Sequence, residues 1–583
     1  MKYVEFNGLS NRPNPGSKLE RYVDTATGIE YRWTGSAYVT AGCNTDELAP
    51  AMVQTNSDGS TSLVWQGGSV LNGLGTTITV GEGGQFATIA EALAYIETQP
   101  STITTYQATG SVALTQYSDT GIFSGGQPHL EVQCNDWLYV PSDAQTLGYS
   151  SHYYRVLGVF GEEAGTADSI TLETGICTFT GSIASPTFVR LQPYVLLLLP
   201  GEHSLSASRD SATRTIIPDG YSIAFVGCGP ETVLSGIPME TPAWGLLSFK
   251  NIRTTTGTLG GYSKNAFPLI SANYPTIYLE DVRYGASYIN DPLSGSENEF
   301  LYGVYCAGLY VNNFRCEFAH DHGVQMSADR LEVNGFFAET AETGIEPLRI
   351  TTLVNRPSAT KPKILNNISI IRKDGTGSTT GTIGAIFFAV GAHSDTANTW
   401  RAYLNGVQVI DSAAYGYSIE VQGGSQAANI FINNGMLESS VVGTEIAASG
   451  SGTKVYLHNT QRPVNGNIRS SVTTSAKVMD YNPNATQSVA YAATITPDAA
   501  VAQTVIVGTL TGGMTVAAPT NPTLGKKLTF AFTQDATGGR TITWNAIFKK
   551  TADAAGAANT KGTTEFVYDG TNWRQVGGQL TWV

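Results

Sequence analysis

A unit of twenty-odd residues recurs through the middle of the chain and restricts its fold more than any other feature. Each copy has a short apolar strand ending in Asn, Asp or Gly, a second alternating strand, and a third strand that begins at Gly. The two best-matched copies, Leu309-Tyr-Val-Asn312-Asn313 and Leu331-Glu-Val-Asn334-Gly335, lie 22 residues apart (334 minus 312). Looser copies surround Asp281, Asn405, Asn433 and Asn459.

This period predicts a β-solenoid, because no single copy buries its own apolar face and the copies must stack around one core. An Asn at the same corner of successive coils tolerates left-handed geometry and hydrogen-bonds its neighbours above and below. Leucine-rich repeats share the period, but their Leu-x-x-Leu-x-Leu pattern is absent. The fold class expected is therefore all-β, with a parallel β-helix at its centre.

Other segments lack the repeat and divide the chain into five parts. Thr88 and Glu91 stand at capping-box spacing before a helical pattern, which predicts a short helix that closes one end of the core. An alternating aromatic pattern between Tyr22 and Tyr38 predicts short strands, and a polar segment from Gln54 to Ser62 reads as a linker. The expected parts are an N-terminal virion-attachment region with its linker (1–75), the opening strand and capping helix (76–102), an inserted small β-domain (103–193), the β-helix (194–484) and a C-terminal β-sandwich (485–583), for trimerisation or carbohydrate binding.

Composition excludes several functions. The net charge of −14 comes with no basic stripe, so nucleic-acid binding is not expected. Apolar runs such as Val195 to Leu199 are too short to cross a bilayer, and no signal peptide is expected at the N-terminus. The six cysteines are scattered without a Cys-x-x-Cys pair, which predicts free, mostly buried thiols of a protein made in a reducing cytoplasm.

Three stretches resemble known families. Thr79 to Leu93, and Leu197 to Gly236, resemble the opening strand, capping helix and first coils of pectate-lyase-like right-handed parallel β-helices. Gly525 to Trp544, and Phe566 to Trp573, resemble a module near the end of many phage fibres. Together they resemble the bacteriophage tailspike and tail fibre depolymerases. The resemblance implies a homotrimer in the virion tail, attached through its N-terminus to a baseplate or adaptor protein, that binds a bacterial polysaccharide.

Glycoside cleavage needs two carboxylates that flank the scissile bond. Aligning the two best copies puts Cys316 opposite Ala338, facing inward, and Glu317 opposite Glu339, facing outward. Adjacent coils lie about 4.8 Å apart, which suits a retaining pair, whereas two coils suit an inverting pair. The predicted catalytic residues, all in this acidic region, are Glu317, Asp321, Glu339, Glu342 and Glu346.

Aromatic rings stack on the apolar faces of sugars, and polar side chains bind their hydroxyls. Glu346 is expected beside Gln325 on the outward face. The predicted substrate-binding residues on the coils near the acidic cluster are Tyr305, Gln325, Trp400, Tyr415 and Glu420. Trp544 and Trp573 are expected in the core of the C-terminal module. His320 and His322 flank Asp321 and read as a polar turn, so neither a metal nor another cofactor is expected.

The leading hypothesis is an endo-acting glycoside hydrolase that depolymerises capsule or O-antigen. The alternatives are a polysaccharide lyase, a non-enzymatic adhesin of the same architecture, and a spacer whose receptor contact lies in the C-terminal module. The chain has no Gly-x-Ser-x-Gly elbow, P-loop or dinucleotide motif, and it lacks the Gly-Asp-Ser motif of esterase-type tailspikes.

Overall fold

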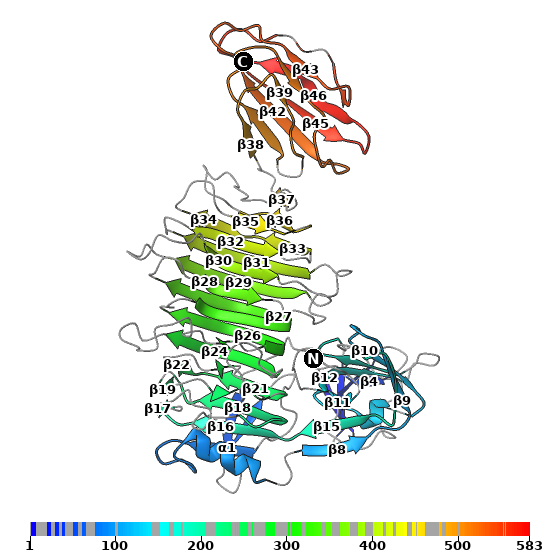
Figure 1. Ribbon diagram of the computed structural model, residues 1–583, viewed down its shortest axis with the longest axis vertical. Helices are drawn as coiled ribbons and strands as arrows, with labels where there is room; N and C mark the ends of the chain where they lie inside the picture. The colour runs from blue at the N-terminus through cyan, green and yellow to red at the C-terminus, as the bar shows by residue number, and fades with distance from the viewer. Residues whose placement is uncertain are drawn as a thin grey trace.

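The computed structural model is almost entirely built of β-strands, as expected (Figure 1). The residues that the structure describes are 2–6, 20–24, 30–33, 38–40, 51–55, 61–65, 76–99, 103–126, 128–141, 152–161, 168–175, 179–204, 217–229, 231–235, 239–240, 242, 244–254, 259–260, 275–285, 301–302, 305–317, 322–340, 346–351, 362–372, 383–390, 400–411, 416–423, 427–439, 446–450, 452–460, 477–480, 486–499, 502–551, 553 and 555–583.

The centre of the molecule is a tall stack of parallel strands, in which each strand pairs with strands one level above and one level below (Figure 1). We call each level a rung. The strands of the stack are β7 (Thr76–Val80), β16 (Pro193–Leu198), β17 (Gly201–Ser204), β18 (Tyr221–Gly227), β19 (Thr232–Ser235), β21 (Gly245–Lys250), β22 (Arg253–Thr254), β24 (Thr276–Gly285), β26 (Tyr305–Glu317), β27 (His322–Thr340), β28 (Glu346–Thr351), β29 (Lys363–Arg372), β30 (Ile383–Val390), β31 (Trp400–Asp411), β32 (Gly416–Gly423), β33 (Ala428–Asn433), β34 (Met436–Ser439), β35 (Ile446–Ser449), β36 (Lys454–His458) and β37 (Lys477–Asp480).

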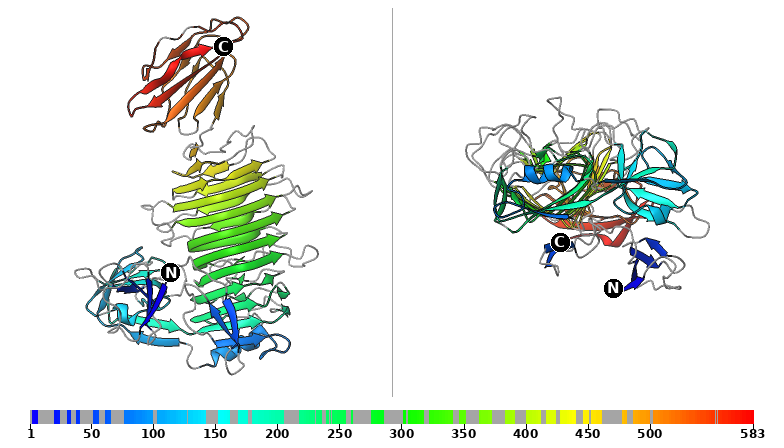
Figure 2. Two further views of the ribbon diagram at one scale, coloured as in Figure 1. Left: turned by 180° about the vertical axis from the view of Figure 1, so that it is seen from behind. Right: turned by 90° about the horizontal axis from the view of Figure 1, so that it is seen from below.

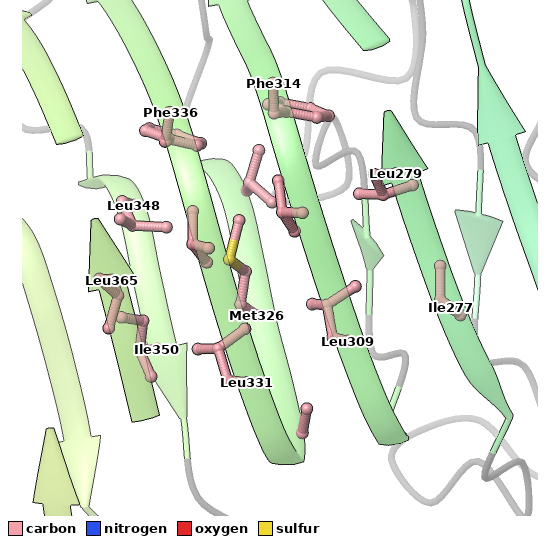
Figure 3. Packing of buried hydrophobic residues seen from close by; sticks show 14 of the residues in the cluster. Ile277, Leu279, Leu309, Phe314, Met326, Leu331, Phe336, Leu348, Ile350 and Leu365 are labelled. Carbon is pink, nitrogen blue, oxygen red and sulfur yellow. The ribbon is translucent and has the colours of Figure 1, made fainter. Parts of the chain in front are cut away.

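Alternate side chains of these strands point into one continuous core, because successive residues of a strand face opposite sides. Like residues stack on like from rung to rung. The rings of Phe314 and Phe336, for example, lie parallel with centroids 5.8 Å apart (Figure 3). Rung length is not constant: 22 residues separate the paired Asn312 and Asn334, whereas 39 separate Asn366 and Asn405. The segments between the paired strands differ in length accordingly.

A sharp bend divides the long strands at one residue with positive φ, and the bends lie above one another. This position is Asn313 (φ 55°), Gly335 (82°), Asn367 (57°), Gly406 (66°), Asn434 (52°) and Asn459 (48°) on rising rungs. Side-chain amides bridge the rungs here, as Asn405 donates to Asn366 and Asn433 donates to Asn405, both at 2.8 Å. The predicted left-handed, hydrogen-bonded Asn corner is confirmed.

The predicted capping helix is confirmed as α1 (Ile89–Glu97), which lies at one end of the stack (Figure 1). Thr88 accepts a hydrogen bond from the Glu91 amide, and the Glu91 carboxylate accepts one from the Thr88 amide. The apolar face of α1, including Leu93 and Ile96, is buried against the first strands of the stack. The helix therefore keeps water from the open end of the core.

A separate eight-stranded sheet with its own core lies beside the lower rungs, as the views in Figure 2 agree. We call residues 103–191 the insert, because the chain leaves the stack after α1 and rejoins it at β16. Its elements are β8 (Ile103–Gln107), β9 (Ser111–Leu114), β10 (Thr120–Ser124), α2 (Pro128–Glu131), β11 (Trp137–Tyr139), β12 (Tyr153–Phe160), β13 (Ser169–Leu172), β14 (Gly181–Ala184) and β15 (Thr187–Leu191).

A buried ion pair joins the insert to the stack. Arg155 and Glu173 of the insert meet at 3.0 Å, with side chains 2% and 1% exposed. Arg155 also donates to the Tyr278 hydroxyl at 2.9 Å, and the Tyr310 hydroxyl donates to Glu173 at 2.8 Å. Tyr278 and Tyr310 belong to β24 and β26, so both charges are fully hydrogen-bonded across the junction.

The N-terminal region contains short strands of two small sheets. Strands β2 (Glu20–Asp24), β3 (Glu30–Trp33) and β4 (Tyr38–Thr40) pair antiparallel in sequence, which confirms the strands predicted between Tyr22 and Tyr38, and β1 (Lys2–Phe6) pairs parallel with β2. Strands β5 (Ala51–Thr55) and β6 (Thr61–Trp65) pair antiparallel. The two ends of the polar segment from Gln54 to Ser62 therefore lie in these strands. Short parallel strands β20 (Met239–Glu240), β23 (Leu259–Gly260) and β25 (Leu301–Tyr302) form a further sheet.

The C-terminal module lies beyond the last rung and consists of two sheets around a shared core (Figure 1). Trp573 is fully buried in it and Trp544 packs against it, as predicted. One sheet contains β38 (Thr486–Val489), β40 (Thr504–Val507), β42 (Lys527–Thr533), β45 (Lys561–Tyr568), β46 (Trp573–Trp582) and β44 (Phe548–Lys549), and the other contains β39 (Thr494–Ile495), β41 (Met514–Val516) and β43 (Ile542–Trp544).

Four of the six cysteines lie in the described residues, and all four are free thiols. Cys306 and Cys316 are buried in the stack, Cys134 is half-buried and Cys228 is exposed, so burial holds for only part of the set. Within the described residues, no helix is long and apolar enough to span a bilayer.

Candidate functional site

The predicted acidic pair lies at matching positions of neighbouring rungs. Glu317 of β26 pairs with Glu339 of β27, and the preceding residues Cys316 and Ala338 are buried in the core. The alignment of the two copies is therefore confirmed in register, and the inward facing of Cys316 and Ala338 is confirmed as well. The side chain of Glu339 is half-buried on the outer face, while that of Glu317 lies outside the described side chains.

The predicted neighbourhood of Glu346 and Gln325 is wrong. Glu346 pairs with His322, whereas Gln325 pairs with Arg349, three residues further along both strands. These partners lie 24 residues apart (346 minus 322), two more than the 22 that separate Asn312 from Asn334. The residue spacing at one corner of the rungs therefore does not predict the spacing at another corner, because the chain segments between the strands differ in length.

Trp400 does not bind substrate as predicted, because it faces the core. It is fully buried, and its ring meets Phe388 edge-on at 5.8 Å. The next residue, Arg401, is exposed. Alternation along β31 therefore sends Trp400 inward and Arg401 outward.

Both carboxylate oxygens of the half-buried Glu420 accept hydrogen bonds from neighbouring groups of the protein. Its Oε2 accepts a hydrogen bond from the Gly384 amide, and its Oε1 accepts one from Gln422 Nε2, both at 3.0 Å. The predicted Tyr305 pairs with Ser327 at the start of β26, and its side chain lies outside the described ones, as do those of Glu346, Gln325 and His322. The predicted residues Asp321, Glu342 and Tyr415, together with His320, lie outside the described residues altogether.

A groove of about 820 Å³ runs up the outer face along the stacked bends, on a side of the strands that the predicted acidic residues do not line. We call it the amide groove, because six of its lining residues are asparagines. Its lining residues are Tyr310, Val311, Asn312, Glu332, Val333, Asn334, Ile364, Asn366, Asn367, Asn405, Gly406 and Asn434.

Charge in the amide groove is nearly balanced. Glu332 is the one carboxylate among the described lining residues, and it pairs with Arg330 at 2.7 Å, with both side chains 25% exposed. Burial first, and then the Glu173 carboxylate, raise the pKa of Tyr310 above its usual value, so its hydroxyl stays protonated and donates to Glu173. The groove therefore exposes side-chain amides, while its carboxylate (Glu332) and its hydroxyl (Tyr310) are already bound by other side chains. Across the part of the chain that is described, no three His, Cys, Asp or Glu side chains gather to hold a metal.

Three half-buried aromatic side chains continue one edge of the amide groove up the stack. We call Tyr403, Phe431 and Tyr456 the aromatic column. Their rings lie nearly parallel, with centroids 4.9 Å and then 4.6 Å apart, at interplanar angles of 11° and 7°. The register places Ile364 directly below Tyr403, so the column rises from a residue that lines the groove.

Neither the groove nor the column was predicted, although the aligned repeats hold the signal. In these copies an aromatic residue stands two positions before the Asn, as Tyr403 does before Asn405 and Phe431 does before Asn433. Two positions apart on a strand means the same face, so aromatic and amide columns must stand side by side. These asparagines were predicted only to form the corners of the coils.

This arrangement suits the chemistry of sugars. Amide groups donate and accept hydrogen bonds, which matches the hydroxyl groups of a pyranose. The exposed edges of the half-buried aromatic rings offer apolar contact to the C–H groups of sugar rings. Among the described lining residues, Glu332 is the one carboxylate, whereas glycoside hydrolysis requires a pair.

Comparison with known families adds one match. Residues 495–573, within the C-terminal module, match the family described as putative phage tail fibre C-terminal domain. This match supports a phage tail fibre, a component of the virion tail. No curated protein matches the chain.

Proposed function

We propose that this chain is the subunit of a phage tailspike or tail fibre that binds a polysaccharide of the bacterial surface along the amide groove and the aromatic column. The observation that carries this proposal is the pairing of stacked amides with stacked aromatic rings on one outer face. In this proposal the stack is a right-handed parallel β-helix, each rung is one coil, and three chains assemble into a trimer attached to the virion through the N-terminal strands.

The match at residues 495–573 supports the setting, and the geometry supports the ligand class. A rung spacing of about 4.8 Å gives the face a regular repeat over many levels. A glycan chain also repeats its hydroxyl groups and apolar faces at regular intervals. A regular polymer is therefore a better partner for this face than a single small molecule.

The test is binding to polysaccharide extracted from a panel of bacterial strains, measured by retention on immobilised polysaccharide. Replacing Tyr403 and Tyr456 together by Ala removes two of the three rings of the aromatic column, and we expect the Kd for the retained polysaccharide to rise about tenfold or more. The matched control is Tyr95→Ala, which removes a partly exposed ring from α1. If both variants bind like the parent chain, or no polysaccharide is retained at all, the proposal fails.

A second candidate function is endo-glycosidic hydrolysis, favoured by the register of Glu317 and Glu339. Carboxylates one rung apart suit the roughly 5 Å separation of retaining enzymes.

For this second function, we expect the retained polysaccharide to shorten and to gain reducing ends on incubation with the protein. Glu339→Gln would lower that rate about a hundredfold or more, and Glu97→Gln on α1 would leave it unchanged. Polysaccharide of unchanged length after binding would leave the chain an adhesin. New ultraviolet absorbance from an unsaturated uronate would indicate a lyase instead.

A further inference from the structure

A row of basic residues stands beside the aromatic column on the same outer face. Arg401 and Lys454 each lie two residues before an aromatic residue, Tyr403 and Tyr456, and therefore share its face. The register aligns Arg401, Asn429, Lys454 and Lys477 in one vertical row. Arg401 is exposed and Lys454 is half-buried.

The charge of this region is opposite to that of the whole chain, which has a net charge of −14. On β31, β33 and β36, the outward positions from Arg401 to Asn405, and their partners above, carry no carboxylate. Within the described residues, Arg401 and Lys454 form no ion pair. By contrast, Arg330 on a lower rung is already paired with Glu332. Two cations beside three stacked rings are thus available to an anionic partner.

The row of cations is short and interrupted. Arg401 and Lys454 lie two rungs apart, which is about 10 Å at the usual strand spacing, with neutral Asn429 between them. Lys477 pairs with Lys454 one rung further up. A single-stranded nucleic acid carries a phosphate on every unit and needs a continuous basic groove. The interrupted row therefore fits a glycan that carries acidic groups on some of its sugars.

We infer that the upper part of this face binds an acidic polysaccharide, with Arg401 and Lys454 each pairing with a negatively charged substituent of the glycan. The exposed edges of the aromatic column pack against the apolar parts of the sugars beside them. This inference rests on the proposed function and adds the charge class of the ligand. The guanidinium of Arg401 offers a planar fork to a carboxylate or phosphate, and the ammonium of Lys454 offers a point charge.

The experiment uses the full chain and the polysaccharide retained in the panel above, in three forms. One form is untreated, one has its carboxylates reduced to alcohols, and one is dephosphorylated. We expect one of the two treatments, and the double variant Arg401→Gln/Lys454→Gln, each to raise the Kd about tenfold. The double variant Arg253→Gln/Arg283→Gln is the matched control. Both arginines are exposed, and they lie at matching positions of neighbouring rungs elsewhere on the stack.

The outcomes separate this inference from the proposed function. Retention of the untreated polysaccharide that neither treatment nor the Arg401/Lys454 variant weakens overturns the inference and leaves the proposed function intact. Equal weakening by the control variant also overturns it, because a general charge effect then suffices. Binding of an oligothymidylate that competes with the polysaccharide would assign the row to nucleic acid instead. A change of oligomeric mass in the variant would assign it to a contact between chains.

Discussion

Lys363, at the start of β29, is fully buried, although a lysine side chain is ordinarily charged and exposed. Its side chain has no exposed surface, and its ammonium donates to the carbonyl of Asp329. Burial lowers the pKa of Lys363 to about 8, from an ordinary value of 10.5, despite the opposing effect of Asp329. The folded chain therefore releases this proton at a lower pH than the unfolded chain does.

The sign of the stability effect follows from this difference. Between about pH 8 and 10.5 the unfolded chain binds the proton more strongly, so the free energy of unfolding gains from this group as the pH rises, by up to about 3 kcal/mol. Chemical denaturation of the parent and of Lys363→Met across this range measures the gain. We expect the difference between the two curves to change in that interval and to be flat below pH 7. A constant difference at every pH would contradict the burial of a titrating lysine.

At the scale of the element, the bend position sets the shape of every long strand. Gly335 and Gly406 occupy the bend on two rungs, and Asn313, Asn367 and Asn434 occupy it on others, all with positive φ. Glycine adopts this region without steric cost, and Asn adopts it more readily than most residues do. Asn, Gly and, at Asp281 of β24, Asp therefore satisfy one backbone requirement on different rungs.

Replacing Asn367 tests this requirement. Asn367→Gly keeps the bend and loses the 3.0 Å hydrogen bond to Asn334, so we expect a loss of about 1 kcal/mol or less. Asn367→Val adds the strain of a β-branched residue in the left-handed region, and we expect a loss about 1–2 kcal/mol greater. Urea midpoints of the two variants give the comparison. A Val variant as stable as the Gly variant would show that the bend imposes no such constraint.

Sequence reading succeeded where a local pattern decides the structure. The capping box of Thr88 and Glu91 and the Asn corners follow from short-range geometry, and the Glu317–Glu339 register follows from two copies without an insertion between them. It failed where distant segments decide. The facing of Trp400 depends on where β31 begins, and the neighbour of Glu346 depends on turn lengths that differ between corners. The amide groove arises only when many rungs are stacked.

At the scale of the molecule, the insert and the candidate binding face are connected through Tyr310. This residue lines the lower end of the amide groove, and its hydroxyl is bound by Glu173 of the insert. The ring of Tyr310 also stacks on Tyr278, at 4.5 Å, and Tyr278 receives a hydrogen bond from Arg155. A buried ion pair that is fully hydrogen-bonded is costly to separate. The insert therefore fixes the lower end of the face on which we propose that the glycan lies.

The central claim is that a polysaccharide lies along the outer face of the stack, over the amide groove and the aromatic column. The most direct measurement is a crystal structure of the chain with an oligosaccharide cut from the polysaccharide that it retains. We expect the sugar rings to follow the stack axis, with rings over Tyr403 or Phe431 and hydroxyls bonded to groove asparagines such as Asn405. An oligosaccharide bound instead beside Glu317 and Glu339, or only on the C-terminal module, would contradict this account.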